Sequence, residues 1–478
     1  MLKQLLGLFI VTTLLNVSLA DYKKDIGYTR VVNELGTKIP KGKGVIVTQS
    51  ESSGKTTAYM PDIKLSEFKN KTITDKSSPL PLGPYSAHAT GVGKAFFGNN
   101  AIANGITEIN CYSANGWLIT DYLNADHRSL EPKAVNDRIA NHSWIGGIKD
   151  EKTILNVLKR IDWVINRDEF IQVVGIKNSA ELNSPMLSAA FNVIAVGKTS
   201  GDNGRSTKLL DPTYISGRSR PHIVVPANTS SGAAPIVAST IAFLIETAHN
   251  NPNLSTDPKE NFTTNRNGEK IYNAERSEVI KAILMAGADK FTNNSTKLKN
   301  DTQNNIIDYR VDQKYHTDNG LDVRYGAGQL NIFNSYKIIS AGEQNSKEDD
   351  PASDGVIVDY GFDYDPSFGG KHTTASYYFT TDTKPGTLIA SLVWNVNIRK
   401  GTIISFPGKA INHNLDLGLY KIKNNNKILI SKSNSLIDNS ENILVSLEPS
   451  SRYLLEVTAS TEQELFEWDY AIAWQISH

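Results

Sequence analysis

The sequence contains a single cysteine, Cys111, among 478 residues. An intrachain disulfide is therefore excluded, and so is a zinc ribbon or an iron–sulfur site, because each needs several cysteines. We expect Cys111 to be a small, buried apolar residue. Net charge is absent as well, since 50 Lys and Arg balance 50 Asp and Glu. That balance argues against a protein that binds nucleic acid by general electrostatics.

After the first 20 residues the chain has no apolar run of membrane-spanning length, which excludes a membrane bundle. Residues 1–20 read MLKQLLGLFIVTTLLNVSLA. A basic residue near the start, a short apolar core and small residues at Ser18 and Ala20 are typical of an export signal. A short membrane anchor is the alternative. We expect a signal peptide over 1–20 and a secreted or periplasmic mature chain of bacterial type, with no membrane contact after cleavage.

The rest of the chain divides into two regions. Over 21–345, short apolar strands alternate with helical stretches, which predicts a mainly parallel sheet flanked by helices. The expected strands include Val45–Val47, Ile106–Ile109, Ile171–Ile176, Val193–Val196 and Ile223–Val225; the expected helices include Glu151–Asn166, Ala233–Ala248 and Arg276–Ala286. Polar stretches at about 250–275 and 290–320 are expected to be surface loops.

The charged stretch 346–354 has no apolar periodicity and is interpreted as a linker. Over 355–478, short runs of alternating polarity are separated by turn residues, and no helical pattern intervenes. That spacing predicts an all-β sandwich domain. The fold class expected for the chain is therefore an α/β domain followed by a β-sandwich, with a linker that would let the first domain act alone.

Two motifs carry a candidate nucleophile and a candidate base. In NTSSGAAP, small residues lead into an apolar helix, with Ser231 at its N-terminal edge. There the backbone N–H groups and the helix dipole favour a developing negative charge. The alternative is that Ser231 is a helix N-cap. In SAHATGVGKAFFG, His88 opens a second helical run; the alternative is an ordinary histidine at a helix start.

Two further motifs end predicted strands with polar side chains. QVVGIKNS brings Asn178 to the end of a buried strand, where its amide could donate to an oxyanion; the alternative is a turn residue. GKGVIVTQSE brings Glu51 to the end of another strand, where α/β sheets place functional residues. The alternative for Glu51 is a solvated carboxylate, and Asp62 is a weaker candidate for the same role.

Together these pieces resemble the subtilisin-like serine peptidases, the S8 or subtilase family. TSSGAAP is similar to the family's G-T-S-x-A-x-P motif, HAT to its H-G-T, and IKN to its A-G-N, in the family's order of acid, His, Asn and Ser. Further similar segments are IANHSWIG, NVIAVG, RPHIVVP and YGAGQLN, so that the likeness covers about 40–340. The departures from the family pattern are Glu51 for Asp, Ala89 for Gly, Gly91 for His, Lys177 for Gly, and Thr229 for Gly.

The resemblance implies a serine-type endopeptidase. Ser231 would be the nucleophile, His88 the general base and Glu51 its orienting acid, with Asn178 in the oxyanion hole. The segment IANHSWIG would pair with extended substrate, which makes Ser143, Trp144 and Gly146 the expected substrate-binding residues. Protein or peptide substrates are expected, with no nucleic acid partner and a monomeric chain.

No cofactor is required by this chemistry, and no metal ligand is assigned. The second region is more loosely similar to β-sandwich appendages of secreted bacterial peptidases. There Asp416, Asp438 and Glu441 could bind a structural calcium ion, although solvated carboxylates are the simpler interpretation. Two alternatives to the peptidase stay open: an inactive subtilisin-like fold acting as a binding or adhesion protein, and an esterase using the same residues.

Overall fold

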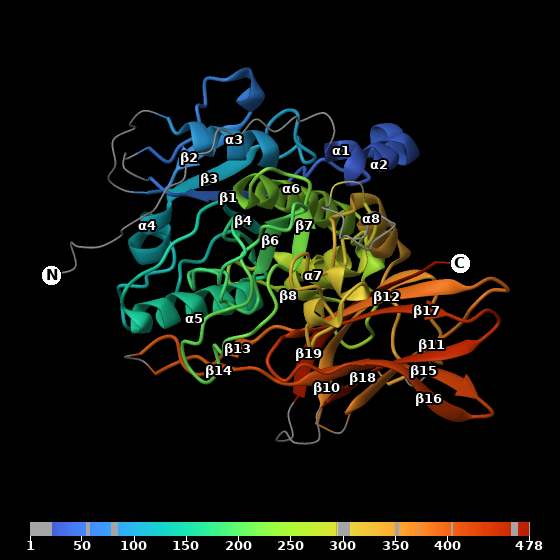
Figure 1. Ribbon diagram of the computed structural model, residues 1–478. Helices are drawn as coiled ribbons and strands as arrows, with labels where there is room; N and C mark the ends of the chain where they lie inside the picture. Colours follow the sequence, from blue (N-terminus) through green and yellow to red (C-terminus); the bar gives the residue numbers. More distant parts are fainter. Residues whose placement is uncertain are drawn as a thin grey trace.

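A computed structural model describes residues 22–53, 58–77, 85–292, 294, 306–348, 353–370, 372–402, 405–459 and 467–477. The predicted signal peptide lies outside these residues. Within them, the chain forms a helix-flanked parallel sheet followed by two antiparallel sheets (Figure 1). The predicted fold class, an α/β domain followed by a β-sandwich, is confirmed.

The first sheet has seven strands in the order β2-β3-β1-β4-β5-β6-β7, all parallel, in the described part of the chain. Its strands are β1 (Val47–Glu51), β2 (Thr72–Asp75), β3 (Glu108–Ser113), β4 (Ile139–His142), β5 (Ile171–Gly175), β6 (Ile194–Lys198) and β7 (Ile223–Val225). In a parallel sheet every strand ends at the same edge, so polar residues that follow neighbouring strands gather there.

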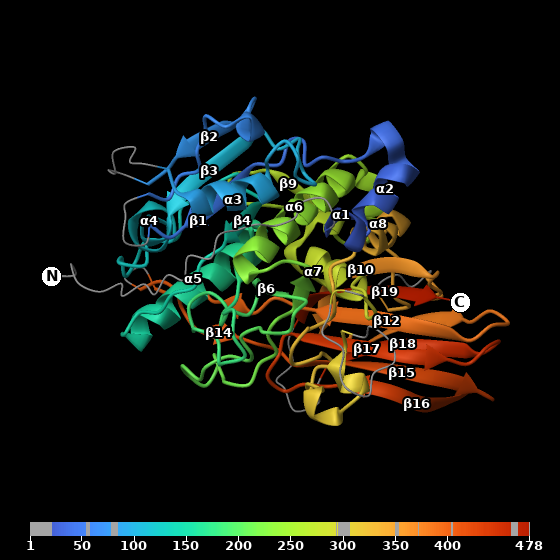
Figure 2. The same ribbon diagram turned by 45° about the horizontal axis from the view of Figure 1, so that its top comes forward.

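Helices cover both faces of this sheet (Figures 1 and 2). The helices are α1 (Tyr22–Asp25), α2 (Tyr28–Leu35), α3 (Ala87–Phe96), α4 (Ala114–Gly116), α5 (Glu151–Asp168), α6 (Ser230–His249), α7 (Ser277–Ala286) and α8 (Ile332–Ala341). Apolar residues of α3, α6, α7 and α8 share one core with alternate residues of the strands. The opposite face packs on α5, on α4 and on the π-helical turn Trp117–Asp121.

One described helix, α6, is long and apolar enough to cross a membrane by its length and composition. However, most of this helix is buried inside the protein. Helix α6 packs against α3, β4, β5 and β6. Its apolar character is that of a central core helix, because a helix that is buried all round is apolar on every face.

The C-terminal region consists of two four-stranded antiparallel sheets, in the orders β10-β19-β12-β17 and β11-β18-β15-β16. Their strands are β10 (Tyr360–Gly369), β11 (Thr374–Thr380), β12 (Gly386–Val393), β15 (Leu415–Lys423), β16 (Asn426–Ser433), β17 (Ser440–Leu447), β18 (Arg452–Ala459) and β19 (Glu467–Ser477). A separate hairpin, β13 (Asn397–Ile398) and β14 (Ala410–Ile411), extends towards α5.

Two sequence expectations for the first region need correction. The stretch at 250–275 is more than a surface loop. It contains the hairpin β8 (Phe262–Thr264) and β9 (Lys270–Tyr272), and it ends in Glu275, which is fully buried and paired with Arg138 Nη1 at 2.8 Å. The strands expected at Val45–Val47 and Ile106–Ile109 each begin two residues later, and they continue to Glu51 and Ser113. Cys111 lies within the second of these strands and is fully buried, as expected.

Candidate active site

Three neighbouring strands position the polar residues that the sequence singles out. Glu51 is the last residue of β1, Ser143 directly follows β4, and Asn178 lies three residues after β5. Strands β1, β4 and β5 are adjacent in the sheet. Because neighbouring strands lie about 4.8 Å apart, this order alone brings the three residues to one short stretch of the sheet edge.

His88 lies in the first turn of α3, which begins after the N-cap Ser86. Its Nδ1 is 2.9 Å from Glu51 Oε2. The Glu51 side chain is 2% exposed, whereas the His88 ring is 36% exposed. A buried carboxylate thus holds one side of a ring whose other side reaches solvent.

This contact fixes the protonation pattern of the imidazole. Glu51 accepts a hydrogen bond, so Nδ1 carries the proton and Nε2 of the neutral ring is left as the basic nitrogen. The negative charge of Glu51 raises the pKa of His88 above its ordinary value of 6.5, against the lowering effect of burial. The second carboxylate oxygen, Oε1, is buried and has no hydrogen-bond partner among the residues that the structure describes. Asp62, the weaker candidate, accepts from the backbone of Lys64 at 3.2 Å and has no hydrogen bond or ion pair with His88 among the described residues.

Ser231 is the second residue of α6, not its N-cap. The N-cap is Thr229, whose Oγ1 accepts from Gly232 N at 3.1 Å. The backbone N–H of Ser231 therefore lies in the first turn, where N–H groups have no intrahelical acceptor. The Oγ of Ser231 lies 3.0 Å from Thr229 Oγ1. Among the described residues no hydrogen bond joins Ser231 to His88.

Asn178 contacts the start of α6 through its amide oxygen. Its Oδ1 accepts from Ser230 N at 2.7 Å. This bond orients the amide, and it leaves Nδ2 as a donor with no partner in the described part of the chain. A second side chain fastens the same turn, since the Ser230 hydroxyl donates to the carbonyl of Ile176. The first turn of α6 is thus tied to the end of β5 by two hydrogen bonds.

The segment after β4 runs beside the same turn. Ser143 Oγ donates to the backbone carbonyl of Ser231 at 3.0 Å. Trp144 is 7% exposed, and its ring lies against Gly146 and edge-on to His142. Burial lowers the pKa of His142 to about 4, so this ring stays neutral. Within the described residues, the backbone of 143–147 makes no hydrogen bond to other backbone.

The structure therefore brings together Glu51 with His88, and Asn178 and Ser143 with the first turn that carries Ser231. The contact that sequence reasoning missed is that of Thr229 with Ser231. Its signal was present, because Thr is a preferred N-cap residue. A sequence predicts the first residue of a helix only to within one or two positions. From the sequence, Ser231 is therefore as good a candidate for the N-cap of this helix as Thr229.

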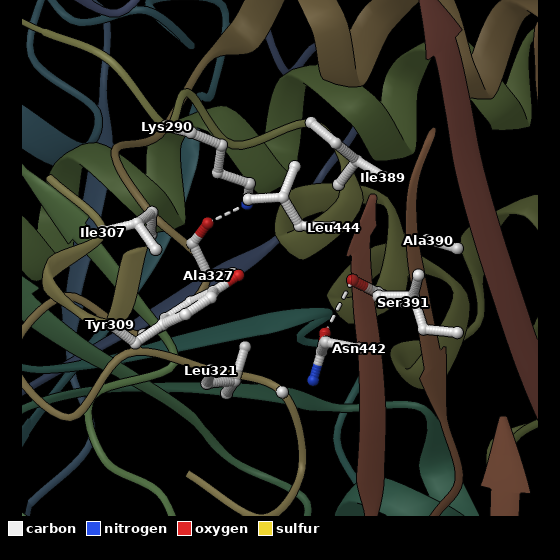
Figure 3. Close-up of a pocket in the computed structure, with 13 residues that line it drawn as sticks. Lys290, Ile307, Tyr309, Leu321, Ala327, Ile389, Ala390, Ser391, Asn442 and Leu444 are labelled. Carbon is white, nitrogen blue, oxygen red and sulfur yellow. Dashed lines mark hydrogen bonds between the residues drawn. The ribbon is translucent and has the colours of Figure 1, made fainter. Parts of the chain in front are cut away.

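Two hollows elsewhere contain none of these residues. A small pocket of about 10 Å³ lies between the sandwich and the α/β region, where Lys290 donates to Ala327 and Ser391 to Asn442 (Figure 3). That volume holds one water at most. An open hollow of about 540 Å³ lies over β2 and β3, lined by polar residues that include Thr72, Asn110 and Asp137.

Among the described residues, no group of three or more His, Cys, Asp or Glu side chains is arranged to hold a metal ion. The carboxylates considered for calcium each contact a protein group. Asp416 pairs with Lys432 Nζ at 2.9 Å, Asp438 accepts from Ser219 N at 2.8 Å, and Glu441 accepts from Ser435 N at 2.7 Å.

No protein-family model matches the chain, and no curated protein matches it. Among solved structures it is similar to tripeptidyl peptidase 2, with 10% identity and a TM-score of 0.30, over 82% of this chain and 40% of that one. It is similar to MycP1, described as a serine protease of the type VII (ESX-1) secretion system, with 12% identity and a TM-score of 0.31, over 67% of this chain and 89% of that one.

A shorter solved structure also matches part of the chain. The pre-peptidase C-terminal domain of a collagenase from Bacillus anthracis matches 25% of this chain and 93% of its own length, with 13% identity and a TM-score of 0.18. Scores this low carry no weight for function. The functional assignment therefore rests on the side chains at the sheet edge.

Proposed function

We propose that the protein is an exported serine endopeptidase of the subtilisin-like type, which hydrolyses peptide bonds through an acyl-enzyme on Ser231. The observation that carries this proposal is the 2.9 Å contact between His88 Nδ1 and the buried Glu51, at the sheet edge that also holds the Ser231 turn. A buried acid, a partly exposed histidine and a serine at a helix N-terminus are the groups that acyl transfer needs.

The proposed reaction runs in two halves. The Oγ of Ser231 attacks the scissile carbonyl while its proton moves to His88 Nε2; the C–N bond then breaks, and the leaving amine takes that proton. A water molecule next attacks the acyl-enzyme, gives its proton to Nε2 and releases the carboxylic acid, and Ser231 recovers its proton. Glu51 stays ionised throughout and stabilises the imidazolium.

Two donors are proposed to stabilise the tetrahedral oxyanion: the N–H of Ser231 and the Nδ2 of Asn178. The 2.7 Å bond to Ser230 N supports this role, because it uses only the amide oxygen and leaves the amino group available. Losing one such donor typically lowers kcat by about 10²–10³. Extended protein or peptide substrate is proposed to pair as an added strand with the backbone of residues 143–146, which makes no hydrogen bond to other backbone in the described part of the chain.

A binding or adhesion protein is the second candidate, because in the described part of the chain Ser231 Oγ has a hydrogen bond with Thr229 and none with His88. A substrate assay with matched variants separates the two. Purified protein should cleave an unfolded protein substrate, and Ser231→Ala should abolish cleavage while the far-UV spectrum is unchanged. Ser446→Ala, which changes an exposed serine of β17 in the sandwich region, is the control and should retain full activity. Absence of cleavage by the wild-type chain, or equal cleavage by Ser231→Ala, would contradict the proposal.

A further inference from the structure

The hydroxyl of Thr229 lies between the start of α6 and the proposed nucleophile. Its Oγ1 accepts from Gly232 N at 3.1 Å and lies 3.0 Å from Ser231 Oγ. The first contact is the N-cap bond of a helix of 20 residues, most of them buried. The position of Thr229 Oγ1 is therefore fixed by the backbone, and through it the position of Ser231 Oγ is fixed as well.

The protons and lone pairs of the two hydroxyls indicate which of Thr229 and Ser231 donates the hydrogen bond between them. A hydroxyl has one proton and two lone pairs. Thr229 uses one lone pair for Gly232 N, and Ser231 Oγ is the acceptor within reach of its proton among the described residues. If Thr229 donates, both of its polar functions are used and the proton of Ser231 stays available. If Ser231 donated instead, its proton would be turned away from the histidine.

We infer that Thr229 is a positioning residue for the nucleophile: its hydroxyl donates to Ser231 Oγ, holds that oxygen in place, and leaves the Ser231 proton for His88 Nε2. This role rests on the proposed peptidase function. A hydrogen bond donated to an oxygen grows stronger as negative charge develops on that oxygen. Thr229 therefore stabilises Oγ as its proton departs, and again when Ser231 is expelled in deacylation.

The inference is tested with two variants of Thr229 and one control. Thr229→Val keeps the shape of the side chain and removes the hydroxyl. Thr229→Ser keeps the hydroxyl and remains a good N-cap. Asp150→Ala removes the N-cap of α5, whose side chain accepts from Thr153 N at 3.1 Å. That control reports what the loss of a cap on a different helix does to activity.

Two assays are made on each protein. The first measures kcat and KM on a peptide substrate. The second measures the rate at which a fluorophosphonate probe modifies Ser231, with the modified residue located by mass mapping. Thr229→Val should lower both kcat and the modification rate by about 10- to 100-fold, the range expected for a hydrogen bond to an atom that becomes charged. KM should be unchanged, because the contact is with the nucleophile. Thr229→Ser and Asp150→Ala should both behave like the wild type.

Three results would overturn the inference while leaving the peptidase proposal intact. They are wild-type rates in Thr229→Val, an equal loss in Asp150→Ala, and a failure of Thr229→Ser to restore the rates. A fourth result has a different meaning. If the wild-type chain is not modified at Ser231 at all, the peptidase proposal itself fails, and the role of Thr229 fails with it.

Discussion

At the scale of single residues, Glu51 and His88 link activity to pH. The charge of Glu51 raises the pKa of His88 above 6.5. The pair therefore contributes its full stabilisation below pH 6.5, and this contribution is lost as pH rises through the raised pKa. Activity follows the opposite course, because His88 acts as a base only once it has lost its proton.

Replacing Glu51 tests its effect on turnover and its effect on the pH dependence of activity. Glu51→Gln should lower kcat by about 10⁴, the effect of replacing a triad acid by its amide in other serine peptidases. The acid limb of kcat/KM should lie above pH 6.5 in the wild type and move to lower pH in the variant, because burial then acts without the opposing charge. Kinetics from pH 5 to 9 measure both effects. Unchanged turnover in Glu51→Gln would mean that another group orients His88.

The sequence predicts most of the residues at the sheet edge, for a physical reason. Glu51 and Asn178 follow apolar strands, and the carboxyl ends of parallel strands share one edge, so order along the chain becomes proximity in space. His88 and Ser231 begin apolar helices. The contact of Thr229 with Ser231 could not be found in this way, because it depends on which of three adjacent residues caps the helix.

At the scale of elements, the hairpin β13–β14 fastens the sandwich region to α5. Phe406, in the loop between the two strands, is 5% exposed and packs edge-on against Trp163 with ring centroids 5.0 Å apart. Arg160 of α5 is fully buried and donates to the carbonyl of Phe406 at 3.1 Å. No local pattern predicts this contact, since its partners are more than 240 residues apart.

Truncating Phe406 should therefore destabilise the whole chain and leave the site intact. Phe406→Ala removes a buried aromatic ring, which typically costs about 3–5 kcal/mol. Leu436→Ala is a suitable control, because Leu436 is 78% exposed and such changes usually stay within about 0.5 kcal/mol. Urea unfolding measures both variants. A Phe406→Ala midpoint equal to that of the control would show that the hairpin contributes little.

At the scale of the whole molecule, the two regions share a core. The cluster that holds α6, α7 and α8 also contains Phe362, Tyr364 and Val393 of the sandwich. Every residue of α7 is buried, because the helix packs against α8 and the 3₁₀ turn Asn273–Glu275 of the first region and against β10, β12 and β19 of the sandwich. The sequence of the linker at 346–354 predicts that the two regions fold independently. A charged stretch without apolar periodicity gives no sign that the regions before and after it pack against each other.

A chain that ends at residue 345 is therefore expected not to fold stably by itself. Removing the sandwich exposes the apolar face of α7 and also the carboxylate of Glu278, which now accepts from Asn395 Nδ2 at 2.9 Å. Gel filtration and thermal unfolding of residues 21–345 measure the outcome, with the chain 21–478 as the control. A cooperative melt with normal kcat would instead establish that the α/β region is an independent domain.

The most direct test of the account is modification of the intact protein with a fluorophosphonate probe, followed by mass mapping. Only a serine activated by a base reacts rapidly with such a probe. We predict one modified residue, Ser231, with a modification rate that rises with pH above 6.5 as His88 loses its proton. Modification at Ser230, or no modification of the folded chain, would contradict the assignment of Ser231 as the nucleophile.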